Sequence, residues 1–383
     1  MNPDAPARGT SLTDAQRLDW LRLIRSDNVG PVAFRQLVNR FGGAGAALDA
    51  LPDLARKGGG RREIRIASVE SAEREMAFAD RFGARFVALG EPHYPRALAA
   101  ADAPPPLIAV VGGTDALTRP ALGVVGSRNA SMAGGKLTAQ FVNAVGGAGY
   151  TIVSGMARGI DAAAHRAALD TGTIACLAGG LDKPFPPENV PLGREIVERG
   201  GALVSEMPFG WVPRGRDFPR RNRLIAGLTL GTLVVEAALR SGSLITARLA
   251  NEMGRLVLAV PGSPLDPRAG GTNGLIRQGA IMATQAADVL EALGPLSADA
   301  LPVTARIEFS ETAWEVPADE EPASDDRSRI VEALGPAPVA VDELIAYLGL
   351  AAGTVQTVLL ELELAGRLER HGGGLVSLLG ADA

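Results

Sequence analysis

The sequence has few of the residues that build disulfide-linked, zinc-bound or membrane-spanning proteins. Its single cysteine, Cys176, excludes an internal disulfide. One cysteine and three histidines (His93, His165 and His371) also exclude a cysteine-type zinc site. The first residues lack a basic and then apolar leader, and no apolar run approaches the roughly 20 residues that span a bilayer. We therefore expect a soluble, cytoplasmic protein without a metal or cofactor.

Lysine is scarce as well, and basic charge is unevenly distributed. Only three of the 38 basic residues are lysines, and the net charge of the 383 residues is −5. Residues 1–103 carry 15 basic and 13 acidic groups, residues 104–294 carry 18 and 14, and residues 295–383 carry 5 and 16. A polyanion responds to the local field, so only the middle region offers it an attractive one.

The middle region, residues 91–294, alternates short apolar runs with helical patterns. Runs without polar alternation indicate strands buried on both faces, and helices between them indicate parallel βαβ units. The sequence therefore predicts an α/β fold with a Rossmann-like, open, mainly parallel sheet of about six strands. These strands are predicted at Leu122–Gly126, Thr151–Ser154, Thr173–Leu177, Ala202–Ser205, Thr232–Glu236 and Leu256–Val260.

Residues 12–90 are predicted to form a small helical module. Thr13 is a candidate N-cap for a first helix, and Phe34 and Leu37 lie on one face of a second. The turn Asn28-Val29-Gly30-Pro31 between them gives a helix-hairpin-helix or SAM-like pattern, with Asn28 in the position that favours a left-handed conformation. Such a turn can offer backbone N–H groups to a phosphate, but a helical packing module is the favoured interpretation.

Residues 295–326 are predicted to be an acidic, proline-containing linker, and residues 327–378 a winged-helix-like domain of three helices and a hairpin. DNA reading by such a domain requires basic or amide side chains on the third helix. Residues 353–364 contain no lysine or arginine and include Glu361 and Glu363. A protein-contact or dimerisation role is therefore favoured, and we expect residues 295–383 to be dispensable for DNA binding.

The loops after the predicted strands combine glycine with serine or arginine. In open α/β sheets, ligands bind at this edge. Gly126 lets the backbone approach a ligand, Ser127 can cap the next helix, and Arg128 can bind a phosphate. A later loop contains five arginines within ten residues, interleaved with Phe218: Arg214, Arg216, Arg220, Arg221 and Arg223. Aromatic rings that stack on bases, beside cations that follow a backbone, are typical of single-stranded nucleic acid binding.

Two enzymatic interpretations are alternatives. Asp161 and His165 lie four residues apart on one predicted helix and could form an acid/base pair, although a capping Asp161 and a packed His165 are favoured. Glu236 follows Gly231-Thr232 in an order close to that of nucleoside-monophosphate phosphoribohydrolases, but one residue too far along the chain. A nucleotide-processing enzyme that uses Glu236 is the alternative function.

Several long stretches resemble the DNA processing protein A family, also called DprA or Smf. The resemblance covers residues 93–290 closely and both terminal domains more loosely. The matching stretches are 125–128, 154–165, 218–228, 235–237, 241–247 and 260–262.

This resemblance implies a protein without catalytic residues that binds single-stranded DNA and loads the RecA recombinase in natural transformation and recombination. It also implies a homodimer formed through the Rossmann-like domain. A basic residue found in the family after a Tyr-Pro turn is Pro187 here, so Lys183, Arg214 or Arg216 would compensate for it. The strand-end loops and the resemblance together give these candidate DNA-binding residues: Gly126, Ser127, Arg128, Ser154, Gly155, Arg158, Lys183, Phe185, Arg216, Phe218, Arg221, Asn222 and Arg223.

Overall fold

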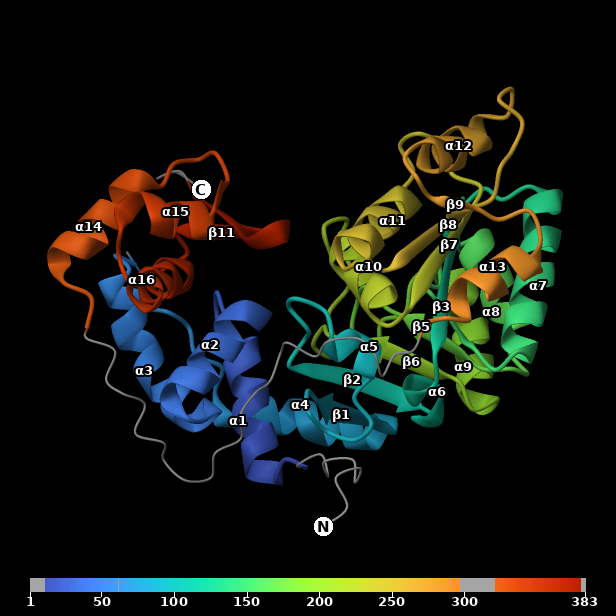
Figure 1. The fold of residues 1–383 in the computed structure, drawn as a ribbon. Helices are drawn as coiled ribbons and strands as arrows, with labels where there is room; N and C mark the ends of the chain where they lie inside the picture. The colour runs from blue at the N-terminus through green and yellow to red at the C-terminus, as the bar shows by residue number, and fades with distance from the viewer. Residues whose placement is uncertain (1–10, 61, 297–320, 380–383) are drawn as a thin grey trace, which may run out of the picture. The chain divides into compact units, whose positions relative to one another are not determined.

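The computed structural model describes residues 11–60, 62–296 and 321–379, and these residues form two compact units. The sheet unit contains residues 75–296. The terminal unit combines residues 12–74 with residues 321–379, from opposite ends of the chain. Each unit has its own hydrophobic core, and Figure 1 shows the elements of both.

A nine-stranded mixed sheet forms the centre of the sheet unit, in the order β1-β2-β6-β5-β4-β3-β7-β8-β9. The strands are β1 (Ala84–Ala88), β2 (Leu107–Gly112), β3 (Ala121–Gly126), β4 (Thr151–Ser154), β5 (Thr173–Cys176), β6 (Ala202–Ser205), β7 (Gly231–Val235), β8 (Leu256–Ala259) and β9 (Ile281–Met282). All six predicted strands are confirmed as β3 to β8, and they pair in parallel. Strands β1, β2 and β9 were not predicted, and β2 pairs antiparallel with both β1 and β6.

Helices cover both faces of this sheet. Helices α7 (Met132–Gly147), α8 (Ile160–Ala167) and α13 (Ala286–Leu293) lie on one face, and α10 (Asp217–Gly227) and α11 (Ser243–Glu252) lie on the other (Figure 1). The chain moves from β3 outward to β6, and then returns through α10 to β7 on the other side of β3. This reversal creates a topological switch point between β3 and β7, where open α/β sheets bind ligands.

Shorter elements complete the sheet unit. They are α5 (Arg96–Ala99), α6 (Asp115–Thr118), η1 (Pro187–Asn189), α9 (Val190–Glu198), η2 (Pro267–Ala269) and α12 (Gly270–Arg277). Helix α4 (Val69–Phe82) begins in the terminal unit and ends in the sheet unit. Among the described residues, no helix combines the length and the apolar character that crossing a bilayer requires.

The N-terminal part of the terminal unit contains α1 (Asp14–Arg25), α2 (Pro31–Phe41) and α3 (Ala44–Lys57). Two local predictions are confirmed. Thr13 caps α1 in a capping box with Gln16. Asn28 has a φ of 58°, the left-handed conformation expected in the turn before α2.

The C-terminal part has the predicted order of three helices and a hairpin. Its elements are α14 (Ser324–Ala333), β10 (Val339–Ala340), α15 (Val341–Leu348), α16 (Ala352–Leu364), β11 (Leu368–His371), η4 (Gly372–Gly374) and β12 (Leu375–Leu378). The three strands form a small sheet in the order β10-β12-β11. Helix α14 begins within the predicted linker, whose residues 297–320 lie outside the described residues.

A substitution of Leu122 tests the core of the sheet unit, because its side chain is fully buried among residues of β3, α7 and α8. We expect Leu122→Ala to lower the free energy of unfolding by about 2–5 kcal/mol, from lost burial and the cavity left behind. Leu239→Ala is the matched control, because Leu239 is 73% exposed. Denaturant unfolding of the full chain measures both, and equal midpoints for the two variants would contradict this core assignment.

Candidate nucleic-acid interface

A cleft of about 650 Å³ lies at the carboxyl ends of β3 and β7, at the topological switch point. Three segments form its walls: the loop after β3, the N-terminal half of α10, and the loop from β7 into α11. Six of the predicted residues line it: Gly126, Ser127, Arg128, Phe218, Arg221 and Asn222. The strand ends that the sequence indicated therefore converge on one concave site.

One wall of the cleft presents a cation beside an aromatic ring. The Arg128 guanidinium lies 5.6 Å from the centroid of the Phe218 ring. Phe185, which is 45% exposed, packs edge-on against the same ring with centroids 5.8 Å apart. Within the described residues, Arg128 makes no hydrogen bond or ion pair, so its N–H donors are available to a ligand.

The loop after β3 closely approaches its neighbours. A Cβ on Gly126 would overlap the carbonyl oxygen of Val235, so a side chain there would separate β3 from β7. The predicted capping role of Ser127 is wrong. Helix α7 begins at Met132, and the Ser131 hydroxyl caps it by accepting from Gly134 N at 2.9 Å. The Ser127 hydroxyl instead accepts from Asn129 N at 3.1 Å and stabilises the loop.

Arg221 forms the floor of the cleft, where it is only 7% exposed. Its guanidinium donates to the carbonyl oxygens of Gly155 and of Cys176, the latter at 2.8 Å, and so joins the ends of β4 and β5. Burial lowers the pKa of Arg221, an effect that the nearby Asp161 carboxylate opposes. The structure thus shows that Arg221 holds the strand ends together, and its contact with DNA stays a prediction.

Asp161 and His165 are both buried, and Asp161 also lines the cleft. The Asp161 carboxylate accepts from Gly155 N at 3.2 Å and from Ala157 N at 3.3 Å, so it binds the preceding loop, and Gly159 is the N-cap of α8. Burial raises the pKa of Asp161 and lowers that of His165 to about 3. His165 Nδ1 lies 2.8 Å from Thr173 Oγ1, which agrees with a packed histidine.

Buried Glu206 holds two of the clustered arginines. Its carboxylate accepts from Arg220 Nε at 3.0 Å and from Arg223 Nη2 at 2.7 Å. Arg223 also donates to the carbonyl oxygen of Ala103, and its side chain is only 20% exposed. Two of the five N–H donors of Arg223 are therefore used within the protein, and the half-exposed Arg220 keeps part of its guanidinium in solvent.

The remaining predicted residues do not line the cleft. Ser154 is buried and donates to the carbonyl oxygen of Val124 at 2.6 Å, a structural contact. Arg158 pairs with Glu188, and Lys183 lies 3.6 Å from Asp182; both side chains remain about half exposed or more. Arg216 is exposed at the start of α10. Arg158, Lys183 and Arg216 therefore lie outside the cleft, and the first two are paired with carboxylates.

Arg240 is a cleft residue that was not among the predicted ones, although the family resemblance covers residues 241–247, which follow it. Arg240 is exposed and lines the cleft on the wall formed by the loop after β7. Among the described residues it makes no hydrogen bond or ion pair. The sequence could have indicated Arg240 by its position in the loop between the buried strand β7 and the Ser-Gly-Ser start of α11.

Glu236, the candidate residue of the alternative enzyme, is bound at the start of α7. Its carboxylate accepts from Ser131 N at 2.9 Å and from the Ser131 hydroxyl. Glu236 has a φ of 53° and is not among the residues that line the cleft. Its contacts are those of a carboxylate at a helix N-terminus, which the helix dipole favours.

Family models match three successive parts of the chain. The model described as DNA recombination-mediator protein A matches residues 85–294, more than half of the sequence. This chain belongs to that family. A DprA-like N-terminal HHH domain matches residues 14–77, and a DprA winged helix domain matches residues 315–374. The family assignment and the fold expected from the resemblance are confirmed.

Curated relatives and solved structures agree with this assignment. Protein Smf of Escherichia coli is 39% identical over 81% of this chain and 81% of its own length, and Protein Smf of Synechocystis is 32% identical over 94% and 98%. DNA processing protein A of Streptococcus pneumoniae superposes with a TM-score of 0.59 at 33% identity, covering 74% of this chain and 98% of that one. The Helicobacter pylori protein, described for its single-stranded DNA binding mode, gives 0.50 at 28%, covering 55% and 95%.

The lowered pKa of His165 predicts acid destabilisation. The unfolded histidine takes up a proton near pH 6.5, whereas the folded one stays neutral down to about 3. The free energy of unfolding should therefore fall by about 1.4 kcal/mol per pH unit below pH 6. The raised pKa of Asp161 acts in the opposite direction at the acid end, so the informative quantity is the difference from His165→Gln.

The measurement is denaturant unfolding of the wild type and of His165→Gln between pH 7 and pH 4. We expect the variant to show a shallower pH dependence. His93→Gln is the matched control, because it makes the same substitution at an exposed histidine. Parallel curves for the wild type and His165→Gln would show that His165 titrates normally in the folded protein.

Proposed function

We propose that this chain binds single-stranded DNA in the cleft between β3 and β7 and acts as a recombination mediator without catalysing a reaction. The carrying observation is the convergence of Arg128, Phe218 and Arg240 on one concave site at the switch point. The family assignment supports the proposal, as does the single-stranded DNA binding named for the Helicobacter pylori protein. All three side chains can contact a ligand without first breaking a hydrogen bond within the described protein.

The arginines and the aromatic rings of the cleft can contact different parts of a DNA strand. Arg128 and Arg240 lie on different walls, so both can bind phosphate oxygens of one strand. Phe218 and Phe185 offer ring surfaces to bases, which stack without regard to sequence. A cleft of about 650 Å³ accommodates individual nucleotides but not an intact duplex. Unpaired bases can enter such a cleft, and we therefore expect preference for a single strand.

The same proposal includes the partners implied by the family resemblance. We infer that the protein delivers its bound strand to the RecA recombinase in the cytoplasm, and that it works as a homodimer formed through the sheet unit. Residues beyond the cleft, including Arg158, Lys183 and Arg216, would continue the path of the strand. The delivery to RecA is tested by co-purification of the two proteins on single-stranded DNA. The homodimer is tested by sedimentation of the protein alone.

The direct test compares single-stranded with duplex DNA of equal length in a gel-shift assay without nucleotide. We expect tighter binding of the single strand and no requirement for ATP. Equal affinities would favour a general basic surface. The alternative enzyme that uses Glu236 would instead release free base from a nucleoside monophosphate, and this release would replace the proposal of a non-catalytic protein.

Arginine variants test the phosphate contacts. We expect Arg128→Ala and Arg240→Ala each to weaken single-strand binding at all sequences alike, since phosphate contacts carry no base information. Each should also flatten the dependence of log affinity on log salt concentration by about 0.7. Arg248→Ala is the control, because Arg248 is an exposed arginine on α11 that does not line the cleft. Wild-type affinity and salt dependence in folded Arg128→Ala protein would remove the cleft from the binding surface.

A ring variant separates stacking from charge. If Phe218 stacks on a base, Phe218→Ala should weaken single-strand binding by about 1–3 kcal/mol and leave the salt dependence nearly unchanged. Phe209→Ala is the comparison, because Phe209 packs with Phe78 and Phe82 and does not line the cleft. Fluorescence titration at several salt concentrations measures both quantities. A salt dependence flattened as in the arginine variants would show that Phe218 acts by orienting Arg128.

A further inference from the structure

The third helix of the winged-helix part is covered by the N-terminal module of the same chain. Eight of the 13 residues of α16 are buried, and α16 packs against α3 and α2. A Cβ on Gly58, at the end of α3, would overlap the carbonyl oxygen of Glu361 and press on Ala365. The two backbones therefore approach as closely as they do inside a domain core, and the helix that reads DNA in winged-helix proteins is not exposed.

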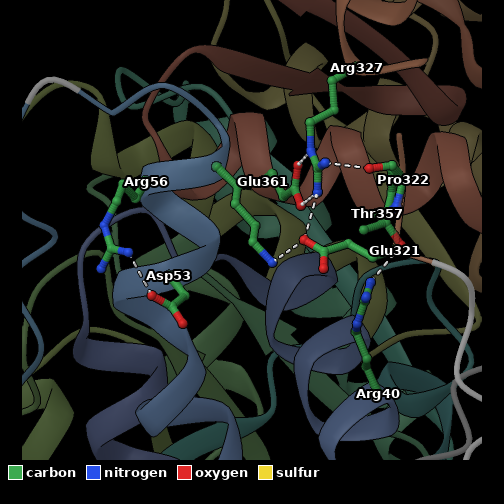
Figure 2. A network of polar contacts seen from close by, with 9 residues as sticks. Arg40, Asp53, Arg56, Glu321, Pro322, Arg327, Thr357 and Glu361 are labelled. Atoms are coloured by element: carbon green, nitrogen blue, oxygen red, sulfur yellow. Dashed lines mark hydrogen bonds and ion pairs between the residues drawn. The ribbon is translucent and has the colours of Figure 1, made fainter. Parts of the chain in front are cut away.

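Polar contacts hold this interface together (Figure 2). Within the C-terminal part, Arg327 of α14 donates two hydrogen bonds of 2.8 Å to Glu361 of α16, which is 1% exposed, and fixes the helix that faces α3. Arg40 of α2 donates to Thr357 of α16 at 2.5 Å, and Lys57 of α3 pairs with Glu321 at 2.5 Å. Basic side chains of the N-terminal module thus point to acceptors in the C-terminal part.

The hairpin turn before α2 is covered in the same way. Asn28 Nδ2 donates to the carbonyl oxygen of Leu364 at 3.0 Å. Beside Gly30, the N-cap of α2, a Glu363 oxygen lies 3.8 Å from where a Cβ would stand. Arg370 binds the Glu363 carboxylate at 2.6 Å and holds it there. A carboxylate therefore lies beside the N-terminus of α2, the end of a helix that favours negative charge.

The charges of the two parts are complementary. Residues 12–74 contain 11 basic and 8 acidic side chains, whereas residues 321–379 contain 4 and 9. The acidic part lies on the basic part, and Glu321 and Glu363 lie against the α3 end and the hairpin turn. The winged-helix part is thus negatively charged, as is the nucleic-acid backbone that a helix-hairpin-helix turn would bind.

We propose that the winged-helix part is an internal cover on the DNA-binding face of the helix-hairpin-helix module. In the closed chain Glu363 takes the position of a phosphate, and the module adds no DNA contact. When the two chain ends separate, the hairpin turn with Arg40 and Lys57 becomes an additional, sequence-independent site for a nucleic-acid backbone. This proposal goes beyond the cleft of the sheet unit and does not depend on it.

The cover also changes what a C-terminal truncation measures. Deleting residues 295–383 removes negative charge, but it also exposes the apolar face of α3 that α16 covers. A substitution that adds atoms between α3 and α16, called a wedge here, is more informative because it changes no charged residue. Gly58→Ala supplies this wedge, and Ala365→Leu presses on the same contact from the opposite side. Gly43→Ala is the matched control, since Gly43 has extended backbone (φ 177°) and open space around its Cβ position.

The first measurement asks whether the wedges open the interface. A protease recognition sequence inserted between residues 297 and 320 of the full chain is cut, and the products are separated by gel filtration. We expect the C-terminal fragment to remain bound in the wild type and in Gly43→Ala, and to separate in Gly58→Ala and Ala365→Leu. Circular dichroism verifies that the uncut variants are folded. Retention of the fragment in both wedge variants would overturn the proposed closure.

The second measurement asks whether opening exposes a DNA site. Binding of a duplex oligonucleotide is measured with uncut protein that also carries Arg128→Ala, so failure of the cleft proposal does not affect the result. We expect each wedge variant to bind several-fold more tightly than Gly43→Ala at low salt. The dependence of log affinity on log salt should steepen by about 0.9 for each phosphate gained. Open variants whose affinity and salt dependence equal those of the control would overturn the proposal.

Discussion

The positive charge of Arg221 is buried beneath the cleft, and the surrounding loops satisfy it. Moving a guanidinium out of water costs several kcal/mol unless hydrogen bonds and an opposite charge compensate. Here the carbonyl oxygens of Gly155 and Cys176 accept its protons, and the Asp161 carboxylate lies nearby. Asp161 in turn binds the amides of Gly155 and Ala157. The ends of β4 and β5 and the start of α8 are thus fixed by one buried charge.

This constraint explains why neighbouring arginines differ in function. Arg221 lies on the buried side of α10, and Glu206 holds Arg223 and one edge of Arg220. Arg128 and Arg240 come from loops at the rim of the cleft, and their guanidinium groups remain available. A rigid floor with exposed cations above it is suited to binding a flexible strand, because the protein loses little conformational freedom on binding.

Local patterns in the sequence predicted much of this arrangement. Uniformly apolar runs located β3 to β8, a capping pattern located α1, and the turn chemistry of Asn28 placed it correctly in the left-handed region. The same patterns identified the cleft edge, because parallel strands bring their carboxyl ends together. Strand β9 was missed because it has only two residues and both are exposed, and the antiparallel pair β1 and β2 was missed because it lies outside the βαβ pattern.

What the sequence could not separate were the roles of residues of one type. Five arginines within ten positions look equivalent, and only burial and partners such as Glu206 distinguish them. Ser127 and Ser131 are both suitable caps, and the choice depends on where α7 begins. The union of residues 12–74 with 321–379 was also hidden, because contacts across some 300 residues leave no mark on local periodicity.

The acidic C-terminal region illustrates how such a contact changes an electrostatic argument. From the sequence, a region with 5 basic and 16 acidic residues is a source of repulsion for any phosphate. In the folded chain, three of these carboxylates form ion pairs: Glu361 with Arg327, Glu321 with Lys57, and Glu363 with Arg370. Arg327 and Arg370 are already among the 5 basic residues counted, so of these three partners only Lys57 lowers the net negative charge of the region. Under the closure proposed above, the acidic region affects DNA binding through the basic N-terminal module that it covers.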